Sequence, residues 1–222
     1  MNASEEPITL YLDYLSQPSR AVLAFCLFNK IPHKIEEVHI LQGQHLKPKY
    51  SKINPLKKVP AINDKGFVLQ ESHAILRYLA DAKDVDTHWY PKEPRRRALV
   101  DRYLDWHHTN TRRSSRYFAA AFKDVFPPGW ITWTVKDEDE PLKKVFKIFE
   151  DVFLGYGEYI NGEEDMTIAD ISAVCEMIQL KSTDFDFEKF PRVNQWIERC
   201  MEHPEMKEAY RVMFKAMNDS KL

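Results

Sequence analysis

The 222-residue sequence predicts an α/β domain followed by an all-α helical domain. Before residue 84, short apolar runs typical of strands alternate with two helical patterns. After residue 95, apolar residues recur three and four positions apart, as in amphipathic helices, and no comparable strand pattern is present. The polar segment 84–94 carries two prolines, the composition of a linker. We therefore expect domains at residues 1–83 and 95–222, joined by residues 84–94.

The N-terminal half begins with a strand, a helix and a second strand. Residues 8–12 form the first apolar run. Pro18 suits the first turn of a helix, and apolar residues between 21 and 28 supply its buried face. Residues 31–32 end that helix, and residues 34–40 can form the second strand. Elements of this length make a βαβ unit, whose two strands should lie parallel in one sheet.

A hairpin and another helix complete this domain. The run after Pro60 can be a strand, the turn signal at residues 64–66 follows, and residues 67–69 are the partner strand. A helix then begins at Glu71 and Ser72, where a serine is a good N-cap. The order βαβ followed by ββα is the thioredoxin-like arrangement, and we expect its strands to share one sheet.

Helical spacing dominates the second half. The patterned positions fall in four groups, at residues 99–106, 142–153, 171–178 and 193–200. Residues 167–170 form a capping box, which we interpret as purely structural and as the start of one core helix. Residues 136–141 are a charge run that we expect to be solvated and to precede the next helix.

Composition excludes several classes of protein. The sequence is 44% hydrophobic and 30% charged with a net charge of −2, so no electrostatic attraction to nucleic acid or anionic membrane is indicated. No apolar run approaches the roughly 18 residues of a membrane span, and the N-terminus lacks signal-peptide features, so a cytoplasmic location is expected. The three cysteines are far apart, which argues for buried packing and against a disulfide framework or zinc site.

Two features of the first domain suit a small peptide ligand that carries carboxylates. The helix N-terminus at Ser72 offers free N–H groups and the positive end of a helix dipole. Pro60 cannot donate a hydrogen bond within a sheet, so the backbone around Val59 should keep free groups that can pair with an extended peptide.

Several spaced motifs resemble those of the cytosolic glutathione transferases. Residues 54–62 (NPLKKVPAI) and 70–79 (QESHAILRYL) resemble the glutathione-binding half of these enzymes. Residues 11–20 (YLDYLSQPSR), 43–46 (GQHL) and 89–91 (WYP) narrow the resemblance to the theta class. The likeness runs from about residue 8 to about residue 215. It implies an enzyme of detoxification whose glutathione thiolate attacks small electrophiles, with glutathione as co-substrate and neither cofactor nor metal.

The resemblance assigns the catalytic role to Ser16. From the residues alone, Ser16 before a helix is simply a cap. The resemblance also makes Tyr11 and Tyr14 competing hydroxyls, because other classes of the superfamily use a tyrosine near the end of this strand. The resemblance favours Ser16, whose hydroxyl would donate a hydrogen bond to the glutathione sulfur.

The remaining glutathione contacts are also implied by the resemblance. Glu71 would meet the γ-glutamyl ammonium and Ser72 the adjoining carboxylate, while the Val59 backbone would pair with the cysteinyl segment. His45 and Lys58 would approach the glycyl carboxylate. Arg112 matches an arginine that faces the site from the second domain, although an arginine on a helix surface is the alternative.

Three further expectations follow from the resemblance. The Val59–Pro60 peptide should be cis, and two chains should form a homodimer. Theta-class chains commonly continue into a segment that covers the site, whereas this sequence ends at Leu222, so we expect an open pocket; which electrophile it takes stays undecided. The alternative to an enzyme is a non-catalytic binding protein that keeps the fold and the glutathione groove.

Overall fold

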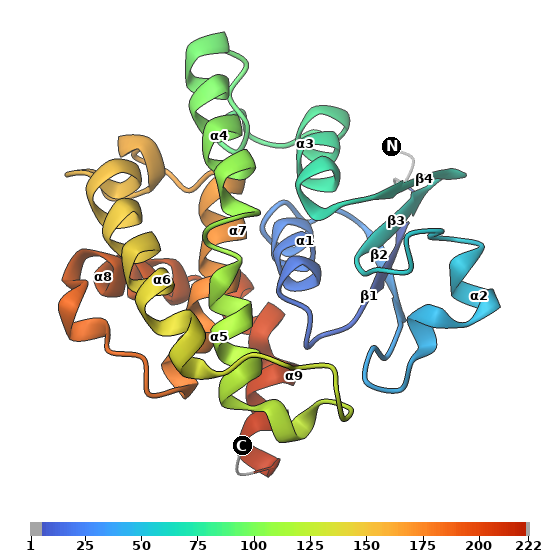
Figure 1. The fold of residues 1–222 in the computed structure, drawn as a ribbon. Helices are drawn as coiled ribbons and strands as arrows, with labels where there is room; N and C mark the ends of the chain where they lie inside the picture. Colours follow the sequence, from blue (N-terminus) through green and yellow to red (C-terminus); the bar gives the residue numbers. More distant parts are fainter. Residues whose placement is uncertain (1–5, 221–222) are drawn as a thin grey trace. The chain divides into compact units, whose positions relative to one another are not determined.

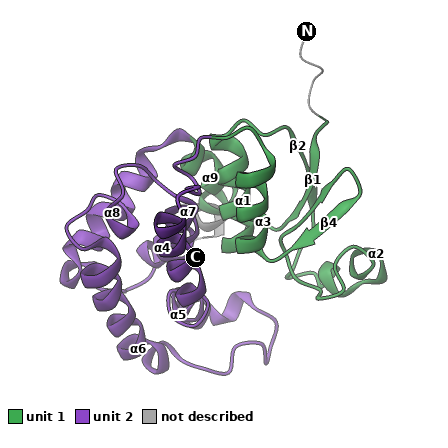
Figure 2. Ribbon diagram, turned by 90° about the horizontal axis from the view of Figure 1, so that it is seen from above, with its two compact units in different colours: residues 1–85, 205–222 green, residues 86–204 purple. Residues whose placement is uncertain are grey.

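The computed structural model describes the backbone of residues 6–220 and the side chains of residues 6–215. The chain divides into two compact units (Figure 2). The first contains residues 1–85 and 205–222, and the second contains residues 86–204. The division falls within the predicted linker, but the last helix groups with the first unit, which the sequence patterns did not indicate. The domain boundaries drawn from the sequence stay a prediction.

A four-stranded sheet forms the centre of the first unit (Figure 1). Its strands are β1 (Ile8–Leu12), β2 (His33–Glu37), β3 (Ala61–Asp64) and β4 (Phe67–Gln70), in the order β2-β1-β3-β4. β1 and β2 are parallel, whereas β3 is antiparallel to both β1 and β4. The predicted thioredoxin-like arrangement is confirmed. The second strand was predicted least accurately, because it spans residues 33–37 and residues 34–40 were expected.

The hairpin between β3 and β4 turns at two residues. Lys65 and Gly66 both have positive φ, 50° and 92°, as a two-residue turn that follows the strand twist requires. The Asn63 side-chain oxygen accepts a hydrogen bond from Gly66 N at 2.8 Å, which closes the turn. The turn signal at residues 64–66 therefore predicted the position of this loop, but Asp64 belongs to β3 and the loop is one residue shorter.

Helices cover both faces of the sheet. α1 (Gln17–Phe28) and α3 (Ser72–Ala82) lie side by side on one face, and the short α2 (Pro48–Ser51) lies on the other (Figure 1). In β1, Ile8, Leu10 and Leu12 are buried under α1 and α3, so alternate side chains such as Tyr11 face α2. α9 (Pro204–Ser220) lies beside α1 (Figure 2). The sequence patterns did not predict α2, because four residues are too few to show a helical period.

The second unit is helical throughout the part that the structure describes, as predicted. Its helices are α4 (Pro94–His107), α5 (Arg113–Ala121), α6 (Val135–Ile148), α7 (Ile168–Met177) and α8 (Pro191–Glu202). Every residue of α7 is buried, so this helix is the centre of the unit. Aromatic side chains pack around it, for example Phe149 against Trp196 with ring centres 4.9 Å apart. Trp89 and Tyr90 are buried although they lie in the predicted linker.

α7 begins at the predicted capping box. Thr167 is the N-cap, and Asp170 in the third helical position accepts hydrogen bonds from the backbone N of Thr167 at 2.9 Å and of Ile160 at 2.9 Å. The Thr167 hydroxyl and the Trp196 indole N–H also donate to Asp170, each at 3.0 Å. The buried carboxylate therefore has four donors, and its interpretation as structural agrees with this geometry.

The charge run at residues 136–141 was wrongly expected to precede a helix. It lies inside α6, because Thr134 and Asp137 form a second capping box and start the helix at Val135. Pro141 is tolerated in its second turn. Glu138 is also not solvated: it is 2% exposed and accepts hydrogen bonds from Arg113 at 2.9 Å and Arg116 at 2.6 Å.

Cys26, Cys175 and Cys200 are free and buried, as expected for packing residues. Among residues 6–220, no helix is long and apolar enough to cross a membrane, and no group of three or more His, Cys, Asp or Glu is arranged to hold a metal ion.

Candidate functional site: one edge of the sheet

The strand register brings most of the predicted site residues to one edge of the sheet. Leu12 at the end of β1 is paired with Glu37 at the end of β2. Ala61 at the start of β3 lies opposite Tyr11 and is also paired with Gln70, the last residue of β4. The segments that leave or enter the sheet at this edge therefore carry Ser16, His45, Lys58, Val59, Glu71 and Ser72.

Ser16 is the N-cap of α1 and is 8% exposed. Its backbone is extended, with φ −83° and ψ 118°, and its Oγ accepts one long hydrogen bond, 3.4 Å, from Ser19 N. A hydroxyl that accepts a bond still has its own proton to donate. Ser16 Oγ–H is therefore free for a partner beside the positive end of α1, because no described residue accepts from it.

Asp13 holds the loop before Ser16. Its carboxylate accepts hydrogen bonds from Leu15 N at 2.8 Å and from Ile40 N at 2.7 Å, and its backbone oxygen accepts one from Ser16 N at 2.9 Å. Ile40 belongs to the loop that leads to His45. One buried carboxylate thus joins the Ser16 loop to the His45 loop.

The segment before β3 is held by two buried side chains. Asn54 Nδ2 and the Tyr50 hydroxyl both donate to the carbonyl oxygen of Lys58, at 2.7 Å and 2.5 Å. The Val59–Pro60 peptide is cis, as predicted. The Val59 side chain packs into a small apolar cluster with Val38 and Tyr50. The backbone of Val59 is therefore held at the sheet edge by its own side chain and by the bonds to its neighbour.

The start of α3 differs from the prediction. Ser72 was expected to be the N-cap, but Glu71 holds that position and Ser72 is the first helical residue. The chain turns from β4 into α3 with Glu71 at φ 68°, and the Glu71 side chain makes no capping bond. Because Ile75 N is the first to bond back to Glu71 O, the N–H groups of residues 72–74 lie outside the helical ladder.

His45 and Lys58 lie in less regular segments. His45 is in the single turn Gln44–Leu46, which follows Gly43 at φ 68°. Burial lowers the pKa of His45, and the Asp13 carboxylate acts in the opposite direction. Lys58 is exposed and next to Val59.

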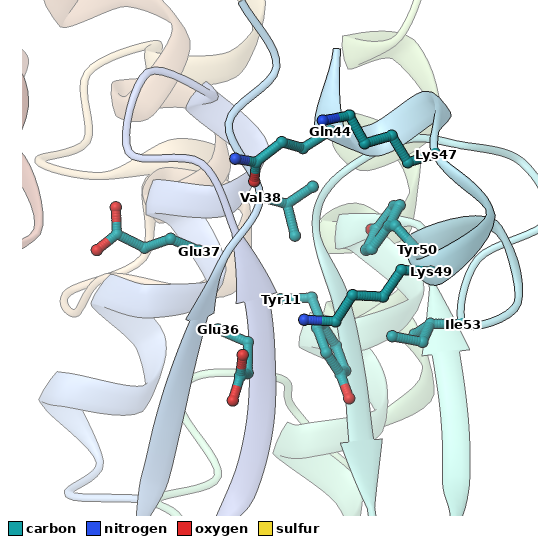
Figure 3. A pocket seen from close by; sticks show the side chains of 9 residues that line it. All are labelled: Tyr11, Glu36, Glu37, Val38, Gln44, Lys47, Lys49, Tyr50 and Ile53. Atoms are coloured by element: carbon teal, nitrogen blue, oxygen red, sulfur yellow. The ribbon is translucent and has the colours of Figure 1, made fainter. Parts of the chain in front are cut away.

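The two competing tyrosines are placed less well than Ser16. Tyr11 faces α2, packs edge-on against Tyr50 with ring centres 6.2 Å apart, and lines a cavity of about 260 Å³ under α2 (Figure 3). Charged groups of β2 and of the segment around α2, among them Glu36 and Lys49, surround that cavity. Burial raises the pKa of Tyr14, and Glu37 raises it further. Neither phenol shares the position of Ser16 at the start of α1.

Arg112 belongs to the second unit and has a strong partner there. Its guanidinium hydrogen-bonds Glu176 of α7, which also accepts from the Ser115 hydroxyl. Burial raises the pKa of Glu176, but Arg112 and His107 outweigh burial and lower it to about 2. Glu176 is 1% exposed, whereas 41% of the Arg112 side chain is exposed. Arg112 is thus anchored at one end and open to solvent along its length.

Sequence reasoning missed four residues that support this edge, Asp13, Arg20, Tyr50 and Asn54. Asp13 and Asn54 had a local signal, since an Asp between a strand and a helix and an Asn before Pro55 favour side-chain-to-backbone turns. Tyr50 and Arg20 had none, because their partners are defined by tertiary packing.

The comparisons with known proteins agree with this geometry. Residues 16–82 match the glutathione S-transferase N-terminal domain family, and residues 133–204 match the glutathione S-transferase C-terminal domain family. The chain belongs to the glutathione S-transferases.

Within that family the similarity is to the theta class. The chain is 36% identical over 219 residues to glutathione S-transferase theta-1 of Mus musculus, covering 94% of this chain and 89% of the mouse protein. Its identity to the Homo sapiens theta-1 protein is 37% over 221 residues, covering 94% and 90%. This is a theta-class chain.

Solved structures support the same assignment. The apo form of human glutathione S-transferase T1-1 superposes with a TM-score of 0.82 at 35% identity, over 95% of this chain and 91% of the human one. A human theta-class glutathione transferase in complex with the glutathione conjugate of 1-menaphthyl sulfate gives a TM-score of 0.84 at 30% identity, over 96% and 89%.

Proposed function

We propose that this protein conjugates glutathione to small electrophiles, and that Ser16 stabilises the glutathione thiolate. The observation that carries the proposal is the Ser16 hydroxyl, which caps α1 through one long bond and keeps its proton. The theta-class relatives support the activity, and the human theta-class structure that contains a glutathione conjugate supports the ligand.

The thiolate is the reactive form of glutathione. A free thiol with a pKa of about 8.5 is only ~3% ionised at pH 7. If Ser16 and the α1 dipole lower that pKa by about two units, the thiolate fraction rises to roughly three quarters, a gain of about 25-fold. One charge-assisted hydrogen bond, worth about 1.5–3 kcal/mol, supplies most of this shift. The sulfur then forms a bond to the electrophilic carbon while the leaving group departs with its electron pair.

The rest of the tripeptide would lie along the sheet edge. The N–H groups of residues 72–74, which lie outside the helical ladder of α3, and the Ser72 hydroxyl suit the γ-glutamyl carboxylate, and the exposed Glu71 suits its ammonium group. The backbone of Val59 suits the cysteinyl segment, as in strand addition. His45 and Lys58 would approach the glycyl carboxylate. These roles are supported by position and charge.

Arg112 is proposed to act from the second unit on glutathione or on the second substrate. Its guanidinium donates from Nη1 to Glu176, which leaves other N–H groups for a ligand. Replacement by lysine would keep the charge but lose the planar fork that two such contacts need.

The test of the proposed function is an ultraviolet titration of bound glutathione, with alkyl halides and epoxides assayed as substrates. We expect a thiolate absorbance at pH 7 in the wild type and conjugation of at least some of these electrophiles. Tight glutathione binding with neither thiolate absorbance nor turnover would instead support the alternative, a non-catalytic binding protein on the same fold.

Two further properties are proposals that rest on the family. We infer a homodimer that uses α3 and the first helices of the second unit, and sedimentation of a stable 26.3 kDa particle at micromolar concentration would contradict it. We also infer a cytoplasmic location from the resemblance to the cytosolic glutathione transferases. Cell fractionation tests that location.

A further inference from the structure

Arg20 is a buried cation one helical turn after Ser16. Its side chain is 0% exposed, and its Nη1 donates to the carbonyl oxygen of Tyr14 at 2.6 Å. Its guanidinium carbon lies 4.5 Å from the centre of the Tyr210 ring of α9. Within the described part of the chain, Arg20 Nε and Nη2 have no hydrogen-bond partner and no carboxylate forms an ion pair with the guanidinium.

Such an arrangement is unusual, because buried charges are normally paired with an opposite charge. An aromatic face attracts a cation through its quadrupole, but it does not neutralise the charge as a carboxylate does. Among the described residues, no carboxylate therefore neutralises this positive charge, which lies inside the first unit against the loop that carries Ser16. A cation in this position can stabilise an anion that binds beside the Ser16 loop.

We propose that Arg20 is a positioning residue for Ser16 and that its unpaired charge stabilises the glutathione thiolate. This inference rests on the proposed function, because it concerns the anion that Ser16 is assigned to bind. Arg20 fixes the Tyr14 carbonyl, two residues before Ser16, so the loop and the start of α1 are held by the same side chain.

Asp13 explains why a cation is needed at this place. Its carboxylate braces the same loop through Leu15 N and Ile40 N, and it is 6% exposed. A negative charge beside the site raises the pKa of a nearby thiol. The positive charge of Arg20 offsets that effect. Asp13 and Arg20 therefore both hold the loop by hydrogen bonds, and their opposite charges compensate each other.

The other charges that face this loop come from two elements. Glu37, the last residue of β2, and Glu208 and Arg211 of α9 act on Tyr14. Glu208 and Arg211 pair with each other at 3.0 Å and are exposed, so solvent screens them. Among the charges named here, Arg20 is the buried cation, and its field is the least screened.

The experiment compares a neutral replacement of Arg20 with a positively charged one. Arg20→Gln keeps a donor but removes the charge, and Arg20→Lys keeps the charge but loses the fork. The pKa of the thiol of bound glutathione is measured by ultraviolet titration in both. A unit charge about 10 Å away at an effective dielectric constant of about 20 shifts a pKa by about one unit. We expect a rise of about one unit for Gln and little change for Lys.

Matched variants separate charge from packing. Lys34→Met removes an exposed charge of β2 and should leave the thiol pKa unchanged. If Arg20→Gln does not fold, as judged by circular dichroism, a second pair replaces it. Tyr210→Glu places a carboxylate against the retained guanidinium, and Tyr210→Gln is its neutral counterpart. We expect only the Glu variant to raise the thiol pKa.

The outcomes are distinguishable from failure of the proposed function. An ordinary thiol pKa in the wild type, or one that Ser16→Ala leaves unchanged, would contradict the role of Ser16. A lowered pKa that depends on Ser16 but is the same in Arg20→Gln and the wild type overturns this inference alone. Equal rises for Gln and Lys also overturn it, because they show that packing, not charge, is responsible.

Discussion

Two helix starts of the helical unit, α6 and α7, use more of their side-chain hydrogen-bonding capacity than two of the sheet unit, α1 and α3. In the helical unit, α6 and α7 begin with capping boxes in which the cap residue and the third helical residue bond each other reciprocally. In the sheet unit, α1 has a cap with one 3.4 Å bond, and α3 has a cap residue whose side chain makes none. Of these four starts, the two with capping boxes are structural, and the two with little side-chain capping lie at the proposed glutathione site; α5 and α8 also begin without a side-chain capping bond.

The contrast is sharpest between Asp170 and Ser16. Both are buried polar residues at the start of a central helix. Asp170 accepts four hydrogen bonds, whereas Ser16 Oγ accepts one and donates to no described residue. A saturated group cannot bind a ligand without losing a partner, so of these two residues only Ser16 has a proton to donate to one.

The largest effect is expected for Asp170→Ala. The change removes the acceptor of four donors, of which Ile160 N and the Trp196 indole lie outside the capping box. Leaving these buried donors unpaired should lower the free energy of unfolding by about 3–5 kcal/mol. Urea unfolding followed by circular dichroism measures this.

Asp137→Ala is the matched control, because Asp137 holds the same position in the exposed capping box of α6. There water replaces the lost bonds, and the loss should be about 1 kcal/mol or less. Equal losses in the two variants would show that burial of the box is not what makes α7 a structural centre.

The second prediction concerns acid stability and Glu176. Its pKa in the folded state is about 2, below the ordinary value of 4.5, so the carboxylate stabilises the fold above about pH 4.5. That contribution, about 3 kcal/mol, is lost as the pH falls from about 4.5 toward 2. Unfolding free energies measured from pH 7 to pH 3 should therefore decrease more steeply below pH 4.5.

Glu176→Gln should remove this steep part of the profile. Burial also lowers the pKa of His107, although Glu176 acts in the opposite direction, so protonation of His107 costs stability below about pH 6.5. The two pH ranges therefore distinguish the effect of Glu176 from that of His107. A Gln variant with the wild-type profile below pH 4.5 would assign the acid sensitivity to other groups.

The third prediction is that Ser16→Ala affects activity much more than stability. Turnover should fall at least tenfold, because the hydroxyl is assigned to an anion that is stabilised in the transition state. Glutathione binding should change little, and the free energy of unfolding should fall by no more than about 1 kcal/mol, since the lost cap bond is long. Steady-state kinetics and urea unfolding on one preparation measure both.

Ser19→Ala is the control for this variant. The Ser19 hydroxyl is buried one turn along the same helix and has no hydrogen-bond partner in the described part of the chain. Its removal should leave turnover and the thiol pKa of glutathione unchanged. Full activity in Ser16→Ala would make Tyr14 the better candidate.

The order of most elements could be predicted because these elements have a local signal, which the short α2 lacks. The alternation in residues 8–12 and the turn at Lys65 and Gly66 place β1 and the hairpin correctly. The charge run in α6 was misjudged, because its solvation depended on Arg113 and Arg116 from another helix. The burial of Glu138 depends on tertiary contacts, which a local sequence pattern does not reveal.

The candidate site was predictable only where a motif existed. The resemblance supplied Ser16, Val59, Glu71 and Ser72, and the register shows why they meet: the ends of β1, β3 and β4 share one sheet edge. The contacts of Asp13 with Ile40 and of Arg20 with Tyr210 were not predicted, because each joins residues that are distant in the sequence.

The smallest effect is expected for Ser72→Ala, which tests the second unsaturated start. Because Glu71 is the N-cap and Ser72 already belongs to α3, loss of the Ser72 hydroxyl should change the free energy of unfolding by no more than about 0.5 kcal/mol. The KM for glutathione should rise by roughly three- to tenfold, since one of several donors to the γ-glutamyl carboxylate is lost. Turnover at saturating glutathione should stay within about twofold, because this contact forms equally in the ground and transition states. Thr134→Ala, at the saturated cap of α6, should do the opposite and lower stability by about 1 kcal/mol without changing KM. If Ser72→Ala instead behaves like Thr134→Ala, the start of α3 is structural and spare hydrogen-bonding capacity does not mark the ligand site there.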